Sequence, residues 1–182
     1  WVGTYYGGVS YASPRVGAIE SIPGHVISHF YEDDKGHIWL ASDDAGLLCI
    51  ENKSQRFNVT TPYNLSSLNC HALYIKGDQL WVGTYSTGIV VIDLESGHKH
   101  HYEKLFDQKG EQLTTSAYAL ATDQQGQMWV GTSDGVCLFD SIHDCFQLVR
   151  RLGDVVIDID QDQNGRRQEL DRIPDRSFFY YV

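Results

Sequence analysis

The sequence contains one tetrapeptide pattern four times, as Trp1-Val2-Gly3-Thr4, Trp39-Leu40-Ala41-Ser42, Trp81-Val82-Gly83-Thr84 and Trp129-Val130-Gly131-Thr132. Each copy is an aromatic residue followed by an aliphatic, a tiny and a hydroxyl-bearing residue. The tryptophans stand at positions 1, 39, 81 and 129, so successive copies are 38, 42 and 48 residues apart. A period of this size indicates a repeat architecture in which each repeat is one supersecondary unit.

Two further features recur in step with the tetrapeptide. Each copy is followed by a glycine that opens an apolar run, in Gly8-Val9, Gly46-Leu47, Gly88-Ile89 and Gly135-Val136. Two copies are preceded by an acidic turn that ends in glycine, Asp33-Asp34-Lys35-Gly36 and Asp123-Gln124-Gln125-Gly126. No stretch has a sustained period of 3.6 residues, so each repeat predicts short strands joined by turns.

The last repeat predicts its four strands near residues 117–122, 127–132, 135–140 and 145–150. Second and third strands are apolar on consecutive residues, as in Ile89-Val90-Val91-Ile92, which indicates that both faces of the sheet are covered. Sheets stacked face to face around an axis satisfy this pattern and the repeat period. The predicted fold is therefore all-β, a β-propeller built of four-stranded antiparallel blades, with the tryptophans in the core between blades.

The repeat period also divides the chain. We expect a partial blade at 1–22, blades at 23–67, 68–113 and 114–152, the first strand of a further blade at 153–165, and an atypical tail at 166–182. Terminal pieces that complete one blade between them would close a ring of four blades and remove its exposed edges. The alternative is a fragment of a larger propeller, and both arrangements are compatible with the sequence.

Composition excludes several classes of function. The 182 residues hold 14 Lys and Arg against 24 Asp and Glu, a net charge of -10 without any basic cluster, so nucleic acid is not an expected partner. No apolar run approaches the roughly 20 residues of a membrane span, so direct membrane insertion of this segment is not expected. The four cysteines include no Cys-x-x-Cys pair, and we expect them to be unpaired structural residues rather than zinc ligands.

The strand, the Asp-x-x-Gly turn, Trp-Val-Gly-Thr and the following glycine together resemble the two-component regulator propeller repeat. That repeat occurs in the periplasmic sensor regions of bacterial hybrid two-component systems. The resemblance covers residues 1 to about 165. It departs at Asp43-Asp44-Ala45, at Lys76-Gly77-Asp78, where the acidic turn is shorter, and at 166–170, where a tryptophan strand is replaced. It implies a non-catalytic, periplasmic sensing module without a cofactor. It also implies an oligosaccharide ligand and, as partners, other blades or sensor protomers, including a homodimer.

The loops between second and third strands are the expected ligand-binding region. In propellers these loops open on one face together with the connections between blades, and loops on rigid scaffolds carry function. They contain aromatic rings and hydrogen-bond acceptors that suit a carbohydrate or a protein surface, while His29 lies on a first strand, the strand nearest the axis. The candidate ligand-binding residues are Tyr5, Tyr6, His29, Asp43, Asp44, Tyr85, Ser86 and Asp134.

Other functions have weaker support in the sequence. No Gly-x-Ser-x-Gly elbow or phosphate-cradling glycine motif is present, so no catalytic residue is expected. A lyase-type propeller enzyme needs histidines and acids converging on the channel, for which His29 is the one candidate. Residues 160–171 superficially fit a calcium loop, but Gly165 aligns with Gly36 and Gly126 at a strand-connecting turn, so no metal is expected. The main alternative to sensing is a scaffold for protein contact or dimerisation without a small ligand.

Overall fold

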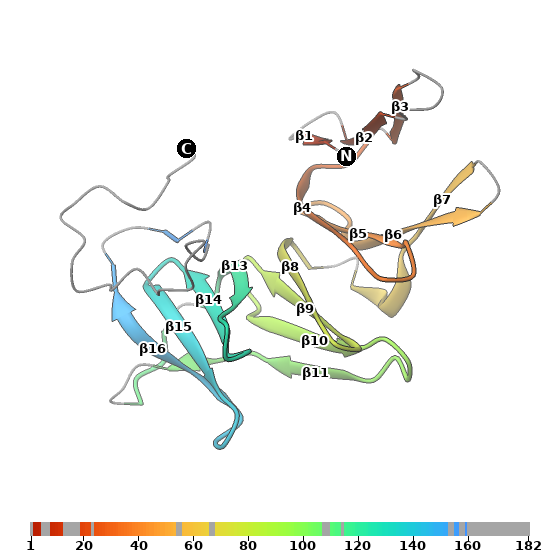
Figure 1. Ribbon diagram of the computed structural model, residues 1–182. Coiled ribbons are helices and arrows are strands. Elements are labelled where there is room, and N and C mark those ends of the chain that lie inside the picture. The colour runs from red at the N-terminus through yellow and green to blue at the C-terminus, as the bar shows by residue number, and fades with distance from the viewer. Residues whose placement is uncertain are drawn as a thin grey trace. The chain divides into compact units, whose positions relative to one another are not determined.

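The computed structural model describes residues 2–4, 8–12, 19–22, 24–53, 56–65, 68–106, 110–113, 115–152, 155–156 and 159. The chain divides into two compact units, residues 1–82 with 91–99, and residues 83–90 with 100–182. Figure 1 shows sheets made of strands that follow one another along the chain. Apart from one short 3-10 turn, Pro62–Asn64, the described residues hold no helix, and none of them forms a segment fit to span a membrane as a helix.

The first unit contains a complete four-stranded antiparallel sheet. Its strands pair in chain order and are β4 (Ile27–Glu32), β5 (Ile38–Ser42), β6 (Gly46–Lys53) and β7 (Arg56–Thr60). A three-stranded antiparallel sheet precedes it, with β1 (Val2–Thr4), β2 (Gly8–Ala12) and β3 (Ile19–Ile22). Short strands separated by tight turns of Asp, Gly and Asn are what the sequence pattern predicts.

The next sheet also follows chain order. Its strands are β8 (Cys70–Lys76), β9 (Gln79–Thr84), β10 (Ile89–Asp93) and β11 (Lys99–Tyr102). The outer strand β11 carries three consecutive exposed residues, Lys99, His100 and His101. Charged and polar side chains on an edge strand disfavour pairing with another chain.

The last sheet confirms the strand predictions for its repeat. The observed strands are β13 (Ala117–Thr122), β14 (Met128–Thr132), β15 (Gly135–Asp140) and β16 (Cys145–Arg151). A fifth strand, β12 (Leu105–Phe106), pairs parallel with β16 at Phe146 and Gln147, which the sequence pattern did not predict. The side chain of Leu105 is fully buried there, so β12 covers the outer edge of this sheet.

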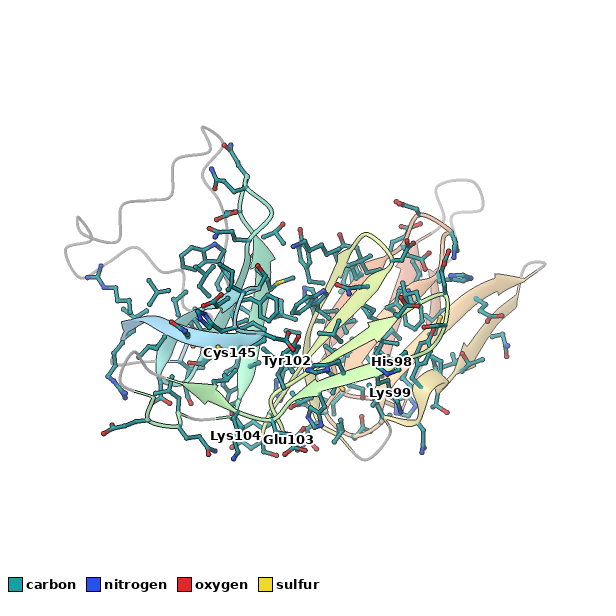
Figure 2. All side chains as sticks on the ribbon, turned by 90° about the horizontal axis from the view of Figure 1, so that it is seen from below. His98, Lys99, Tyr102, Glu103, Lys104 and Cys145 are labelled. Atoms are coloured by element: carbon teal, nitrogen blue, oxygen red, sulfur yellow. The ribbon has the colours of Figure 1, made fainter. Side chains whose placement is uncertain are left out.

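Tyr102, at the end of β11, joins β12 in covering that edge. Its ring packs edge-on against Phe139 and Phe146, with ring centroids 5.5 and 5.3 Å apart. Its hydroxyl donates a hydrogen bond of 2.6 Å to Oδ1 of Asp144 in the β15–β16 turn. Figure 2 labels Tyr102 beside Cys145, the first residue of β16.

The tryptophans lie in the core, as predicted. Trp39, Trp81 and Trp129 are 5%, 4% and 9% exposed, whereas Trp1 lies outside the described residues. Every residue of β5 and β14 is buried, which confirms that these second strands are covered on both faces. Burial of rings of this size is a major source of stability, because an indole removes a large apolar area from water.

The hydroxyls of Ser42, Thr84 and Thr132, each at the end of a tetrapeptide, close the loop that follows. Thr132 Oγ1 donates to the carbonyl of Gly135 (2.9 Å) and accepts hydrogen bonds from the backbone amides of Asp134 and Gly135, each 3.1 Å. Thr84 makes the equivalent bonds to Gly88 and Thr87. Ser42, Thr84 and Thr132 are all fully buried, so this hydroxyl satisfies backbone groups that would otherwise lack a partner.

Candidate ligand-binding loops

The loop between β5 and β6 holds Asp44 in an internal hydrogen-bond network. Its Oδ1 accepts bonds from the hydroxyl of Ser42 (2.6 Å) and from the backbone amide of Val26 (3.0 Å). Its Oδ2 lies 3.5 Å from Nδ1 of His25. The Ser42 bond, reinforced by Val26 and His25, holds the pKa of Asp44 below its ordinary value despite some burial.

Asp43 links this loop to the first strand of the next sheet. Its Oδ1 accepts a bond of 2.7 Å from the Ser28 hydroxyl and lies 3.2 Å from Nε2 of His71 on β8. Nucleophilic catalysis by serine requires a histidine placed between the serine and the acid. Here Ser28 and His71 both approach the same carboxylate oxygen, so the arrangement serves as a structural link between strands.

His29 makes a second link to β8. Its ring is exposed, and its Nδ1 accepts a hydrogen bond of 3.2 Å from the backbone amide of Leu73. The structure therefore brings together three predicted site residues, His29, Asp43 and Asp44, at one end of the first unit. Each of them has a partner within the chain.

The loop between β9 and β10, in the second unit, presents Tyr85 and Ser86. Tyr85 is 51% exposed, among the largest exposures of any aromatic or aliphatic side chain in the described part. Its ring meets Tyr118 of β13 edge-on, with centroids 6.2 Å apart and an interplanar angle of 78°. Ser86 is also exposed.

The backbone of this loop is held by the segment that precedes β13. The hydroxyl of Thr115 donates to the Ser86 carbonyl (2.6 Å), and the hydroxyl of Ser116 donates to the Tyr85 carbonyl. The backbone amide of Gly88 donates to the Thr115 carbonyl, at 2.7 Å. Residues outside the loop therefore hold its backbone, while the side chains of Tyr85 and Ser86 are exposed to solvent.

The loop between β14 and β15 places Asp134 against the outer strand. Its Oδ1 lies 3.3 Å from Nη1 of Arg151, and its carbonyl accepts a bond of 3.1 Å from the amide of Leu152. Tyr5 and Tyr6, the other two predicted site residues, lie outside the described residues. So do the calcium-like segment 160–171 and the tail at 166–182.

Five residues around these loops were not among the predicted site residues: Ser28, His71, Thr115, Ser116 and Tyr118. All five lie on first strands or directly before one. A signal for them existed, because connections between blades end at the same face as the loops between second and third strands. The sequence pattern alone assigned no partner to any of them.

The first unit also contains a cavity of about 230 Å³ near the Asp33 turn, which the sequence did not predict. Tyr63 stacks on Trp39 there, with centroids 6.0 Å apart and planes inclined by 22°. Gly97 is also close to Tyr63, and a Cβ added there would lie 3.5 Å from the ring. Tyr63 therefore contributes to packing, and its partial burial raises its pKa.

Carboxylates dominate the polar lining of this cavity. The lining includes one lysine, Lys35, and four acidic residues: Asp33, Asp34, Glu51 and Asp78. It therefore favours neutral or cationic groups over anions. Across the residues that the structure describes, no three His, Cys, Asp or Glu side chains are grouped to hold a metal ion.

Comparison with known families identifies the repeat. The family model described as two component regulator propeller matches residues 21–44 and 112–134. These two segments are similar to the two-component regulator propeller repeat. Each matched segment contains a first strand, an acidic turn, a tryptophan strand and at least part of the loop that follows, Asp43-Asp44 in one and Ser133-Asp134 in the other. No curated protein sequence matches the chain.

Solved structures confirm the fold of these propeller repeats. An extracellular domain assigned to the hybrid two component system BT4673 of B. thetaiotaomicron aligns with a TM-score of 0.69 at 17% identity, over 90% of this chain and 23% of that one. The corresponding domain of BT3049 from the same organism gives 0.60 at 25% identity, over 84% and 20%. PorZ, a surface component of the type-IX secretion system of Porphyromonas gingivalis, gives 0.63 at 16% identity, over 88% and 28%.

The predicted fold class, a β-propeller of four-stranded antiparallel blades, is therefore confirmed. The chain spans only about a quarter of the length of the three structures named above, 23% of the BT4673 domain, 20% of the BT3049 domain and 28% of PorZ. It corresponds to a segment of such domains.

Proposed function

We propose that this chain is the ligand-receiving part of a two-component sensor, a non-catalytic propeller segment on the extracytoplasmic side that responds to an oligosaccharide. The family match and the extracellular neighbours support a sensing role. The observation that carries the ligand proposal is the β9–β10 loop, where an exposed tyrosine and an exposed serine stand on a backbone fixed by hydrogen bonds. Aromatic faces with adjacent hydroxyls suit sugars.

The blade layout belongs to the same proposal. Sheets β4–β7, β8–β11 and β13–β16 occupy the segments assigned to blades 23–67, 68–113 and 114–152. Segment 153–165 is proposed as the first strand of a further blade. Its support is Val156, whose amide donates to the Thr132 carbonyl at 3.0 Å and whose side chain packs with Trp129.

Signalling would follow from differential affinity. A ligand shifts an equilibrium between two arrangements of a sensor only if it binds one of them more tightly. Ligand contacts with this chain would supply the binding free energy. The two arrangements would differ in how sensor protomers or neighbouring blades pack. The backbone of the loop at Tyr85 and Ser86 is held by hydrogen bonds from the segment directly before β13. Such a loop suits this role, because a ligand bound there contacts an ordered part of the fold.

The test is a thermal shift and calorimetry panel on the chain. Neutral probes are xylohexaose, cellohexaose and mannohexaose, the cationic probe is a chitosan oligomer, and the anionic probes are oligogalacturonate and heparin fragments. A sensor gains stability as RT ln(1 + [L]/Kd), so a rise in Tm of several degrees with one glycan class is expected. No rise with any probe, together with dimerisation in sedimentation, would instead establish the scaffold function.

A further inference from the structure

The carboxylates among the predicted site residues are engaged within the chain. Asp43 binds Ser28 and His71, Asp44 binds Ser42 and Val26, and Asp134 faces Arg151. A ligand that used these groups would first have to displace their partners, and each displaced hydrogen bond would leave a group to be satisfied again. We therefore assign Asp43, Asp44 and Asp134 a structural role, that of stabilising their loops through contacts within the chain.

Tyr85 and Ser86 differ from these acidic residues because their side chains are exposed and their backbone is held in place. Tyr85 is 51% exposed and Ser86 is exposed, so both side chains offer surface to a ligand. The carbonyls of these same two residues are fixed by Thr115 and Ser116, and His101 contacts the neighbouring Thr87 carbonyl. A loop that is already ordered loses little conformational entropy when a ligand binds.

The chemistry of the loop specifies the ligand class. Tyr85, Ser86, Thr87, Thr115 and Ser116 are all uncharged, and the whole chain carries a net charge of -10. An aromatic face attracts the C–H face of a sugar ring, and a serine hydroxyl donates to or accepts from sugar hydroxyls. Sulfated or carboxylated sugars would meet the negative field of the chain, and none of these five residues carries a positive charge to compensate.

We infer that Tyr85 is the stacking platform for one neutral pyranose ring, and that the Ser86 hydroxyl binds a hydroxyl of that sugar. This inference rests on the proposed function and names its ligand class and its contact residues. The Tyr118 ring contacts the Tyr85 ring at an interplanar angle of 78°, which orients the platform, and Tyr85 stays 51% exposed to a sugar.

The test uses calorimetry with xylohexaose, cellohexaose and mannohexaose on the full chain and on four variants. Tyr85→Ala is expected to weaken binding of the preferred hexasaccharide by about tenfold, the equivalent of about 1.4 kcal/mol. Tyr85→Phe keeps the ring and should stay within about threefold of the parent chain. Ser86→Ala should cost a few-fold. Ile142→Ala removes a side chain that is 88% exposed in the turn between β15 and β16 and should leave binding unchanged.

The outcomes separate the inference from the proposed function. If a neutral hexasaccharide binds and Tyr85→Ala binds it equally well, the inference is wrong and the sensing proposal stands. If only heparin fragments or oligogalacturonate bind, the neutral-sugar assignment is wrong. If none of the probes binds, the proposed function fails and the inference fails with it. The melting temperature of each unliganded variant should match the parent, because both loop side chains are exposed.

Discussion

The indole nitrogen of Trp129 donates a hydrogen bond of 3.0 Å to Oδ2 of Asp123. The other oxygen of Asp123 accepts the backbone amides of Gln125 and Gln127, at 3.0 and 2.9 Å, so one carboxylate both closes the turn and holds the core indole. Asp33 and Trp39 repeat this bond at the same distance. The spacing of six residues between acid and tryptophan thus has a physical reason in the two repeats that carry the Asp-x-x-Gly turn.

Asp123→Ala should destabilise the chain by about 1–3 kcal/mol, because the buried Trp129 indole and two turn amides lose their acceptor. Urea unfolding measures this loss. Gln124→Ala, in an exposed position of the same turn, is the matched control and should cost less than about 0.5 kcal/mol. Equal losses for the two variants would show that the indole bond contributes nothing to stability.

Asp33 should make stability depend on pH. Burial acts to raise its pKa, but hydrogen bonds from Trp39 and His37 outweigh burial and hold the pKa below the ordinary 3.8. The ionised form is therefore favoured in the folded state, and its contribution is complete above 3.8 and declines as pH falls through the folded-state pKa.

Asp33→Asn keeps a hydrogen-bond acceptor but does not titrate. The free energy of unfolding of this variant should fall less than that of the parent between about pH 6 and about pH 3. Asp34→Asn, exposed in the same turn, controls for the change in net charge. A parent chain and an Asp33→Asn variant with parallel pH profiles would contradict the assignment.

Gly88 and Gly126 form a matched pair of glycines with positive φ, +84° and +73°. Alanine is strained at both positions, which should cost about 1–2 kcal/mol in Gly126→Ala, where the space around the Cβ is open. In Gly88→Ala the Cβ would also collide with the carbonyl of Tyr102, so the loss should be clearly larger. Denaturant melts of the two variants decide this, and an equal loss would contradict the close approach of Tyr102.

Tyr102 contributes through its ring more than through its hydroxyl. Tyr102→Phe removes the bond to Asp144 and should cost about 1 kcal/mol, whereas Tyr102→Ala also removes the packing on Phe139 and Phe146 and should cost at least about 2 kcal/mol. Thermal and urea unfolding measure both. A Phe variant as unstable as the Ala variant would place the contribution in the hydrogen bond.

The four free cysteines should react at different rates. Cys49, Cys70 and Cys137 are buried, and burial raises the pKa of each thiol to about 12. Because the thiolate is the reactive form, a disulfide reagent at about pH 8 should label one thiol per folded chain rapidly, that of Cys145, and all four after unfolding. Cys145→Ser should abolish the rapid phase of labelling. Any thiol that still reacts rapidly in that variant would contradict the burial of Cys49, Cys70 and Cys137.

The sequence was most informative where side chains repeat with a fixed period. Trp129 and its apolar neighbours fixed strand β14 to within one residue of the predicted start, 127 against 128. The parallel strand β12 was not predicted, because two residues are too few to show a period. Its position depends instead on the burial of Leu105 against a strand about 40 residues further along the chain.

The candidate site could be predicted only in outline. The loops carrying Asp43, Tyr85 and Asp134 were predicted from the repeat, since each follows a tetrapeptide. Some side chains in these loops form ion pairs with residues distant in sequence, such as Asp43 with His71 and Asp134 with Arg151. The repeat pattern does not indicate which side chains do so. A periodic pattern specifies the position of a loop in the fold, but it contains no information about which residues distant in sequence its side chains contact.

The most direct test of the account is a nitrogen-15 NMR titration of the chain with the hexasaccharide that raises its Tm most. We predict that amide shifts concentrate at residues 84–88 and 115–118, the β9–β10 loop and the segment that holds it. Shifts centred on Asp33, Trp39 and Tyr63 would place the ligand in the cavity of the first unit and contradict the account, as would a spectrum that the sugar leaves unchanged.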